Sequence, residues 1–152
     1  MPPLFTIGYE KAALRDVLHT LKQAKVELLI DTRAVAASRR AGFSKRMLAA
    51  SLQEQGIDYL HLQKLGTPAE GREAARAGNL KTLWRIYGKH IKTPEAQAQL
   101  GDLEALVRED RRICLLCYER DPDECHRSRI AELIQERTGR KIENLFTPPL
   151  GI

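Results

Sequence analysis

A stretch in the last third of the chain gathers side chains whose types and spacing could do chemistry. Residues 112–127 read RICLLCYERDPDECHR: an apolar run of strand length with two cysteines, a polar loop, and the start of a helical pattern. Glu119 and His126 could supply an acid and a base. Cys125 would become a nucleophile if a cation or a helix N-terminus lowered the pKa of its thiol. Ligands of open α/β sheets bind where a strand leads into a helix, so the stretch predicts a site without naming a reaction.

The geometry of this stretch depends on where its helix begins. Asp121 as N-cap, Pro122 at the first helical position and Glu124 at the third form a helix-start signal. With that start, His126 lies on the apolar face of the helix and Cys125 is turned away from it. Neighbouring helical residues do not face each other, so a joint Cys–His pair would not form. If the chain instead stays irregular through Glu124, Cys125 begins the helix and this objection lapses.

Two stronger chemical signatures do not match the spacing. Structural zinc sites take four ligands in close pairs, but Cys114 and Cys117 point to opposite faces of a strand. We therefore expect no metal and no other cofactor, and Cys117 is typical of a small buried hydrophobe. A phosphatase loop would need an arginine six residues after Cys117, where the chain has Asp123. No glycine-rich phosphate fingerprint is present either.

A basic segment follows another predicted strand. Between Asp31 and Glu54 there is no acidic residue, and the basic residues are Arg33, Arg39, Arg40, Lys45 and Arg46. The net charge of +5 and the pI of about 9.3 favour anionic partners. The segment is either a solvated basic loop or an anion-binding rim in which Arg33 forks onto a phosphate or carboxylate. Asp31 would orient Arg33, act as a base, or only pair with a neighbour.

The elements that must position these residues alternate between strands and helices. Such alternation predicts a single α/β domain over residues 1–152, with a mostly parallel sheet covered by helices on both faces. Rossmann-like and flavodoxin-like strand orders both fit. Residues 66–93 predict one or two helices broken by glycine, and a lid over the site. The predicted strands are 4–9, 26–30, 57–62, 113–118 and 141–146, and the other predicted helices are 14–21, 44–55, 94–107 and 121–137.

A parallel sheet would bring four strand ends to one edge. Gly8 would allow a backbone or a ligand to approach closely there. Asp123 and Glu124 already satisfy the dipole of the last helix, so we expect a bound anion to contact Arg33, Arg39 and Arg127. The residues at the four ends are Gly8–Glu10, Asp31–Arg33, His61 and Glu119–Arg120.

Composition limits the class of protein. A chain of 152 residues with 43% hydrophobic and 30% charged residues can bury a core without cross-links. No apolar run reaches the roughly 18 residues of a membrane span, and the N-terminus does not resemble a signal peptide. We therefore expect a cytoplasmic protein whose three cysteines are reduced thiols. The few aromatic residues do not form a stacking platform for single-stranded nucleic acid.

Short motifs in order along the chain resemble the family called domain of unknown function 488, whose members are small bacterial and archaeal proteins. The resemblance implies site positions, adding Tyr9 and Ser38 as binding candidates, and implies no reaction. Thr32 and Ala36 stand where the family often has Val and Pro, and Asn144 stands where a histidine is common. The motifs are Thr6–Glu10, Asp31–Arg33, Ser38–Arg39, Phe43–Ser44, Gly56–Tyr59, Leu65–Gly66, Leu116–Glu119 and Cys125–Arg127.

Three functions fit the sequence. The first is an enzyme for an anionic substrate such as a phosphate-bearing molecule, a nucleotide or a nucleic acid. The second is a non-catalytic nucleic-acid or nucleotide-binding module. The third is a protein-interaction domain in which the Cys–His–Arg cluster only ties the last helix to the sheet. For the enzyme, the catalytic candidates are Glu119, His126, Asp31 and Cys125, and the binding candidates are Gly8, Tyr9, Arg33, Ser38, Arg39 and Arg127.

Overall fold

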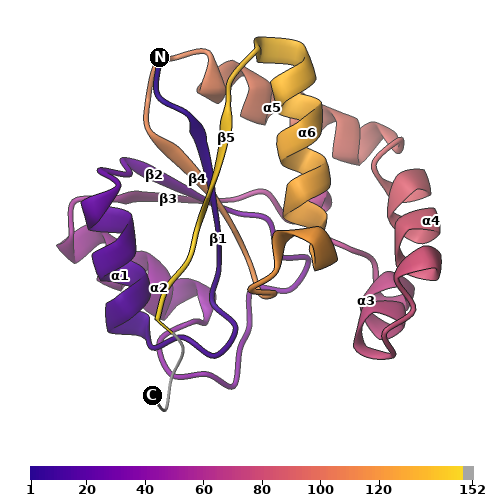
Figure 1. Ribbon diagram of the computed structural model, residues 1–152, viewed down its shortest axis with the longest axis horizontal. Coiled ribbons are helices and arrows are strands. Elements are labelled where there is room, and N and C mark those ends of the chain that lie inside the picture. Colours follow the sequence, from indigo (N-terminus) through magenta and orange to yellow (C-terminus); the bar gives the residue numbers. More distant parts are fainter. Residues whose placement is uncertain (149–152) are drawn as a thin grey trace.

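Five parallel strands form one sheet in the computed structural model, which describes residues 1–148 (Figure 1). The predicted α/β architecture is confirmed, and each strand lies within one or two residues of its expected position. The strands are β1 (Leu4–Gly8), β2 (Leu28–Asp31), β3 (Asp58–His61), β4 (Ile113–Cys117) and β5 (Ile142–Leu145).

The strand order is β3-β2-β4-β1-β5. It differs from both orders that fit the sequence, because β4 lies between β1 and β2. The residues of β1 and β4 are all buried, whereas β3 and β5 are half exposed at the two edges. Strands buried on both faces read as continuous apolar runs, so β4 has the composition of a central strand. Its central position brings residues 118–127 between the ends of β1 and β2.

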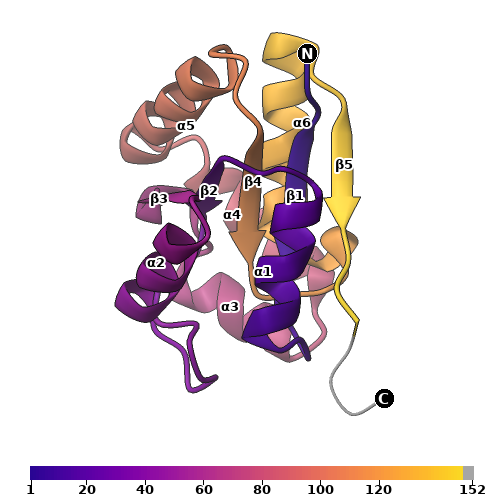
Figure 2. The ribbon, with the colours of Figure 1, turned by 90° about the vertical axis from the view of Figure 1, so that its left-hand side faces the viewer.

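Helices cover both faces of the sheet, as Figure 2 shows from a second side. On one face, α1 (Leu14–Gln23) and α2 (Lys45–Glu54) pack on side chains such as Phe5 and Leu29. On the other face, α5 (Pro94–Val107) and α6 (His126–Thr138) pack on side chains such as Ile30 and Leu115. Side chains alternate along a strand, so Cys114 belongs to the first core and Cys117 points toward the side of α6.

The glycine-containing segment after β3 forms a short 3-10 turn, η1 (Gln63–Leu65), and two helices, α3 (Ala69–Arg76) and α4 (Leu80–His90). They pack on each other beside α6, with α3 toward the carboxyl edge of the sheet (Figure 1). Within residues 1–148, no helix has both the length and the apolar character that crossing a membrane requires.

The last helix begins later than its start signal predicted. Asp121 and Pro122 open a 3-10 turn, η2 (Pro122–Glu124), in which the Asp121 carboxylate accepts from the Asp123 N–H at 2.9 Å. Cys125 then has an extended backbone, with φ −128° and ψ 143°, and serves as the N-cap of α6. The prediction of a continuous helix from Asp121 is therefore wrong. The alternative, in which Cys125 begins the helix, is confirmed.

Candidate functional site

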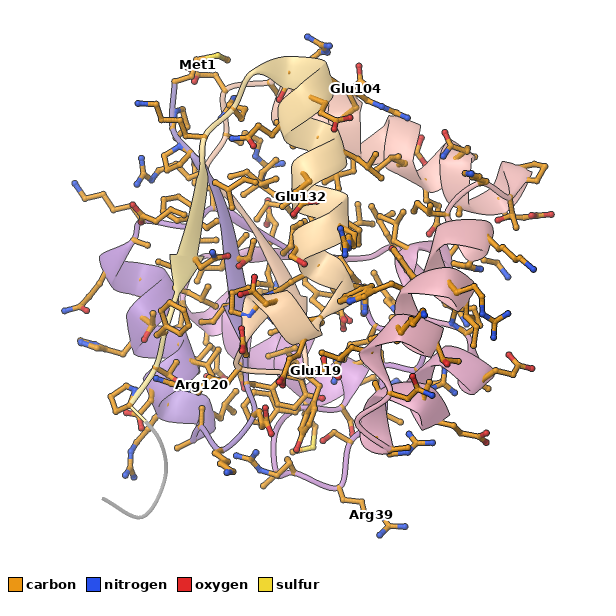
Figure 3. All side chains as sticks on the ribbon, turned by 45° about the vertical axis from the view of Figure 1, so that its right-hand side comes forward. Met1, Arg39, Glu104, Glu119, Arg120 and Glu132 are labelled. Atoms are coloured by element: carbon orange, nitrogen blue, oxygen red, sulfur yellow. A yellow bond between two sulfur atoms is a disulfide. The ribbon has the colours of Figure 1, made fainter. Side chains whose placement is uncertain are left out.

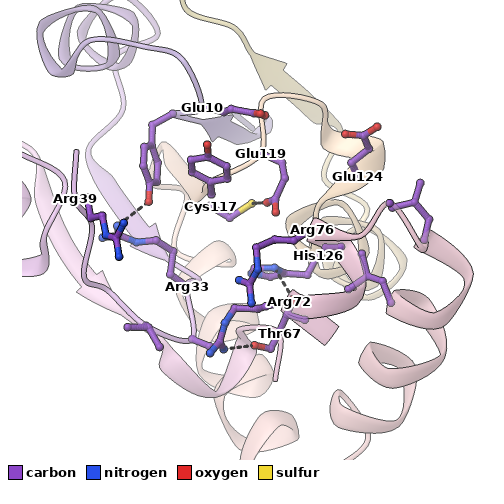
Figure 4. A pocket seen from close by; sticks show the side chains of 18 residues that line it. Glu10, Arg33, Arg39, Thr67, Arg72, Arg76, Cys117, Glu119, Glu124 and His126 are labelled. Atoms are coloured by element: carbon purple, nitrogen blue, oxygen red, sulfur yellow. Dashed lines mark hydrogen bonds between the residues drawn. The ribbon is translucent and has the colours of Figure 1, made fainter. Parts of the chain in front are cut away.

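A pocket of about 840 Å³ opens at the carboxyl edge of the sheet (Figure 4). The residues after β1, β2 and β4 form one side, and α3 with the start of α4 forms the other. The predicted meeting of strand ends is thus the floor of a cavity, and the segment predicted as a lid forms its outer wall. Tyr9, Arg33, Arg39, Glu119 and His126, all site candidates from the sequence, line this pocket.

The pocket has a basic side and an acidic side. Arg39, Arg72 and Arg76 face it from the basic loop and from α3, and none of the three forms an ion pair with a residue in 1–148. Glu10, Glu119 and Glu124 lie opposite (Figure 4). Arg39 is exposed at the outer end of its loop (Figure 3). Arg72 donates from one terminal nitrogen to the Thr67 carbonyl at 2.9 Å, and an anionic group that enters the cavity would meet the remaining N–H donors of these guanidinium groups.

Asp31 and Arg33 form a buried ion pair in which nearly all hydrogen-bond donors and acceptors are used. Arg33 donates from Nε and one terminal nitrogen to the Asp31 carboxylate at 2.9 and 2.7 Å. Its other terminal nitrogen donates to the Tyr9 hydroxyl and the Phe43 carbonyl at 3.1 and 2.7 Å. Four of about five guanidinium N–H groups are thus engaged. Asp31 is fully buried and also accepts from the Arg33 N–H and the Tyr59 hydroxyl, so it orients Arg33 and has no acceptor site left for a substrate.

Three other binding candidates have different surroundings. A Cβ added to Gly8 would lie 1.8 Å from the Glu119 carbonyl oxygen, so the close approach at Gly8 is that of a backbone. Tyr9 stacks on Phe43 with ring centroids 4.4 Å apart, and it forms part of the pocket wall. Ser38 is hydrogen-bonded to Ser44 within the basic loop and does not line the cavity.

His126 joins two loops. With Nε2 assigned as the protonated nitrogen, it donates to the Thr32 carbonyl at 2.8 Å, and Nδ1 accepts from the Thr67 hydroxyl at 2.9 Å. Burial lowers the pKa of His126 to about 4, so the ring is neutral at neutral pH. Both ring nitrogens are occupied. His126 therefore connects the start of α6 with the ends of β2 and of the loop before α3. This geometry supports a structural role more than proton donation to a substrate.

Cys117 and Cys125 are joined as a disulfide between the end of β4 and the start of α6. The structure pairs these two sulfurs, which the expectation of three reduced thiols did not include, while Cys114 is free and buried. The reason is the irregular start of α6, which places Cys125 over the end of β4. Cys117 lines the pocket and Cys125 lies behind it.

Arg127 lies beneath the pocket and is fully buried. It donates to Cys117 Sγ at 3.3 Å and to the carbonyls of Glu119 and Arg120. No carboxylate in residues 1–148 pairs with it, and its Nε has no partner there. Burial lowers the pKa of Arg127 to about 10, so it stays charged at neutral pH. Arg127 thus holds the Cys117 loop and does not line the cavity.

Glu119 is the carboxylate best placed for chemistry. Its Oε2 lies 3.5 Å from Cys117 Sγ, at the pocket surface (Figure 4). Burial raises the pKa of Glu119, with Arg127 opposing that effect. A carboxyl group with a raised pKa can hold and release a proton nearer to neutral pH than an exposed one.

One group of potential metal ligands is present in residues 1–148: Cys117, Cys125 and His126, whose ligating atoms lie within 4.8 Å of one another. With the two sulfurs bonded to each other, neither is a thiolate that could bind a metal. The sequence did not predict this grouping, because the expected helix start turned Cys125 away.

Arg72 and Arg76 are charged pocket residues that were not predicted from the sequence. They lie in a segment without a recognised motif, but their spacing of four places them on one face of α3. That spacing, together with the prediction of a lid, was the available signal.

The family model described as domain of unknown function DUF488 matches residues 13–134. No curated protein and no solved structure matches the chain.

Proposed function

Because the chain belongs to the domain of unknown function 488 family, whose description names no activity, we propose a function from the site alone. We propose that the protein is a cytoplasmic enzyme that binds a small anionic substrate against Arg39, Arg72 and Arg76, with Glu119 moving a proton. The observation that carries the proposal is that three arginines without an ion pair in residues 1–148 face a carboxyl of raised pKa across one cavity.

The size and charge of the cavity support a small substrate. Its volume of about 840 Å³ falls within the roughly 300–1,000 Å³ of small-molecule sites. Guanidinium groups bind phosphate and carboxylate oxygens with paired N–H donors. A phosphate-bearing molecule or a carboxylate of about mononucleotide size therefore fits the proposal better than a nucleic-acid duplex.

The binding step is tested by thermal unfolding with inorganic phosphate, mononucleotides and short oligonucleotides. A ligand at a hundred times its Kd adds about 2.7 kcal/mol of stability, which is a shift of several degrees. The double variant R72A/R76A should lose roughly tenfold or more in affinity. R15A removes an exposed arginine of α1 and should bind like the wild type. Equal binding by both variants would contradict the proposal.

The catalytic step is tested with Glu119→Gln on any ligand found. Proton transfer by a positioned side chain contributes roughly 10²–10⁴-fold, so turnover should fall by that factor while the ligand shift persists. Binding without turnover in the wild type would favour the non-catalytic module instead. A stable E119Q protein with full turnover would remove Glu119 from the mechanism.

A further inference from the structure

We propose that Cys117 and Cys125 are a redox-active pair that reduces an anionic low-molecular-weight disulfide, with Cys117 as the attacking thiolate and Cys125 as the resolving thiol. The inference deepens the proposed function, because it names the substrate class of the same pocket. It stands on the position of the two sulfurs, on Arg127 and on Glu119.

The two cysteines differ in access. Both side chains are about 1% exposed in the structure, but Cys117 lines the pocket and Cys125 does not. A disulfide-bonded molecule in the cavity can therefore reach only the sulfur of Cys117. Because Cys125 is close enough to be bonded to that sulfur, it can displace a group attached there. This is the arrangement of an attacking and a resolving cysteine.

Arg127 supplies the charge that a thiolate needs. A buried cation is costly unless an anion accompanies it, and Arg127 has no carboxylate partner within residues 1–148. Its guanidinium nitrogen lies 3.3 Å from Cys117 Sγ. In the reduced protein, a Cys117 thiolate would be the missing anion. Arg127 therefore lowers the pKa of the Cys117 thiol and raises the fraction of thiolate that can attack a disulfide.

Glu119 can accept the proton of the Cys117 thiol and pass it to a leaving thiolate. Its Oε2 lies 3.5 Å from Cys117 Sγ, so it can accept the Cys117 proton when the thiolate forms. The same carboxyl can then protonate a thiolate that leaves in the pocket. His126 also faces the pair, with Nδ1 4.0 Å from Cys125 Sγ, but the Thr67 hydroxyl occupies that nitrogen.

The reaction balances without a further reactant. The Cys117 thiolate attacks one sulfur of RS–SR, the S–S bond breaks, and the leaving RS⁻ takes the proton from Glu119. Cys125 then loses its proton to water and attacks the sulfur of Cys117. The bond from Cys117 to RS breaks, and the second RS⁻ takes a proton from water. One dithiol and one disulfide thus become one protein disulfide and two RSH.

A structural role alone explains the pair less well. The bond closes a loop between residues only eight positions apart. Arg127 already ties this loop to α6 through the carbonyls of Glu119 and Arg120. Both sheet faces have complete cores, and a domain of this size needs no cross-link to fold.

The experiment uses the full chain, reduced with dithiothreitol, freed of it, and mixed without oxygen with glutathione disulfide, an anionic probe. Mass spectrometry should show the internal disulfide and two glutathiones released per chain. C125S should stop as a mixed disulfide at Cys117, C117S should not react, and C114A, which removes the buried free cysteine, should react like the wild type. An unreactive wild type, or a mixed disulfide formed at Cys125, would overturn the proposal.

The role of Arg127 is tested by the pH profile of alkylation in the C125S background. An opposite charge nearby lowers a pKa by about 1–3 units, so R127M should slow alkylation at pH 7 by roughly tenfold or more and shift the profile to higher pH. R127K keeps the charge and should restore most of the rate. Equal profiles for all three proteins would show that Arg127 only supports the fold.

Two further arms separate this inference from its competitors. R72A/R76A should slow the reaction with glutathione disulfide and not with the neutral hydroxyethyl disulfide. If neither reaction is slowed, the proposed anion site is contradicted, while the proposed role of the cysteine pair is not.

Stoichiometric zinc in the reduced protein, with thiols that react only after chelation, would instead assign the Cys117, Cys125 and His126 group to a metal. A much faster reaction with hydrogen peroxide would overturn the substrate class.

Discussion

Two buried arginines lie at the same edge of the sheet and have opposite surroundings. Arg33, after β2, is paired through two nitrogens with the buried Asp31 carboxylate. Arg127, after β4, contacts a sulfur and two backbone carbonyls, and its Nε has no partner among the described residues. A guanidinium whose donors are satisfied holds a fold together. A guanidinium without an anionic partner can instead stabilise a nearby thiolate. The comparison therefore gives Arg33 a role in the fold and Arg127 a role in the proposed thiol chemistry.

Breaking the ion pair between Arg33 and Asp31 should have the largest effect on the free energy of unfolding. In Asp31→Asn, Arg33 stays buried without its counter-charge, and loss of one partner of such a pair costs about 3–5 kcal/mol. Denaturant unfolding at pH 7 measures this loss. Asp58→Asn breaks the exposed pair with Arg111 and serves as the control, because such pairs contribute about 0–1 kcal/mol. Similar losses for both variants would contradict the difference between the two pairs.

The pH dependence of stability probes His126, which contacts the Thr32 carbonyl next to Arg33 and directly precedes Arg127 in α6. Burial lowers its folded pKa to about 4, below the unfolded value of about 6.5. Between these values the unfolded chain binds more protons, so stability is lost as pH falls from about 6.5 to about 4. The loss should be about 3 kcal/mol. Unfolding measured across this range should show a flatter pH dependence for His126→Gln than for the wild type.

Gly8 lets the loop of the second arginine approach β1. A Cβ at this position would lie 1.8 Å from the Glu119 carbonyl oxygen, which also accepts from Arg127. Gly8→Ala should therefore displace residues 119–120 and cost about 1–3 kcal/mol. Thermal unfolding checks the stability, and alkylation of Cys117 checks the site. Gly88→Ala, at a helical position with open space around the added Cβ, should be neutral or stabilising.

The smallest effect on stability is expected at Arg76 of α3. Arg76 is exposed and has no ion pair in residues 1–148, so Arg76→Ala should change stability by no more than about 0.5 kcal/mol. The same variant should weaken the binding of phosphate in the thermal assay. Loss of stability together with unchanged binding would give Arg76 a structural role and remove it from the anion site.

The local elements and the edge that carries the site were determined by the sequence. Apolar runs such as Ile113–Cys117 and the helical spacing of Leu100, Leu103 and Val107 depend only on neighbouring residues, and they predicted strands and helices that the structure contains. Parallel strands then require their carboxyl ends to meet, which brought Arg33, Glu119 and His126 to one pocket.

Tertiary structure decided the strand order, the pairing of Cys117 with Cys125 and the surroundings of Arg127. The placement of β4 between β1 and β2 depends on packing across the whole sheet, which no local pattern encodes. The disulfide of Cys117 and Cys125 depends on one extended residue at the start of α6, where the local signal favoured a helix. The pairing of Asp31 with Arg33, two residues away, was one of the alternatives that the sequence offered, whereas the lack of a carboxylate partner for Arg127 within residues 1–148 depends on which side chains the fold places around it.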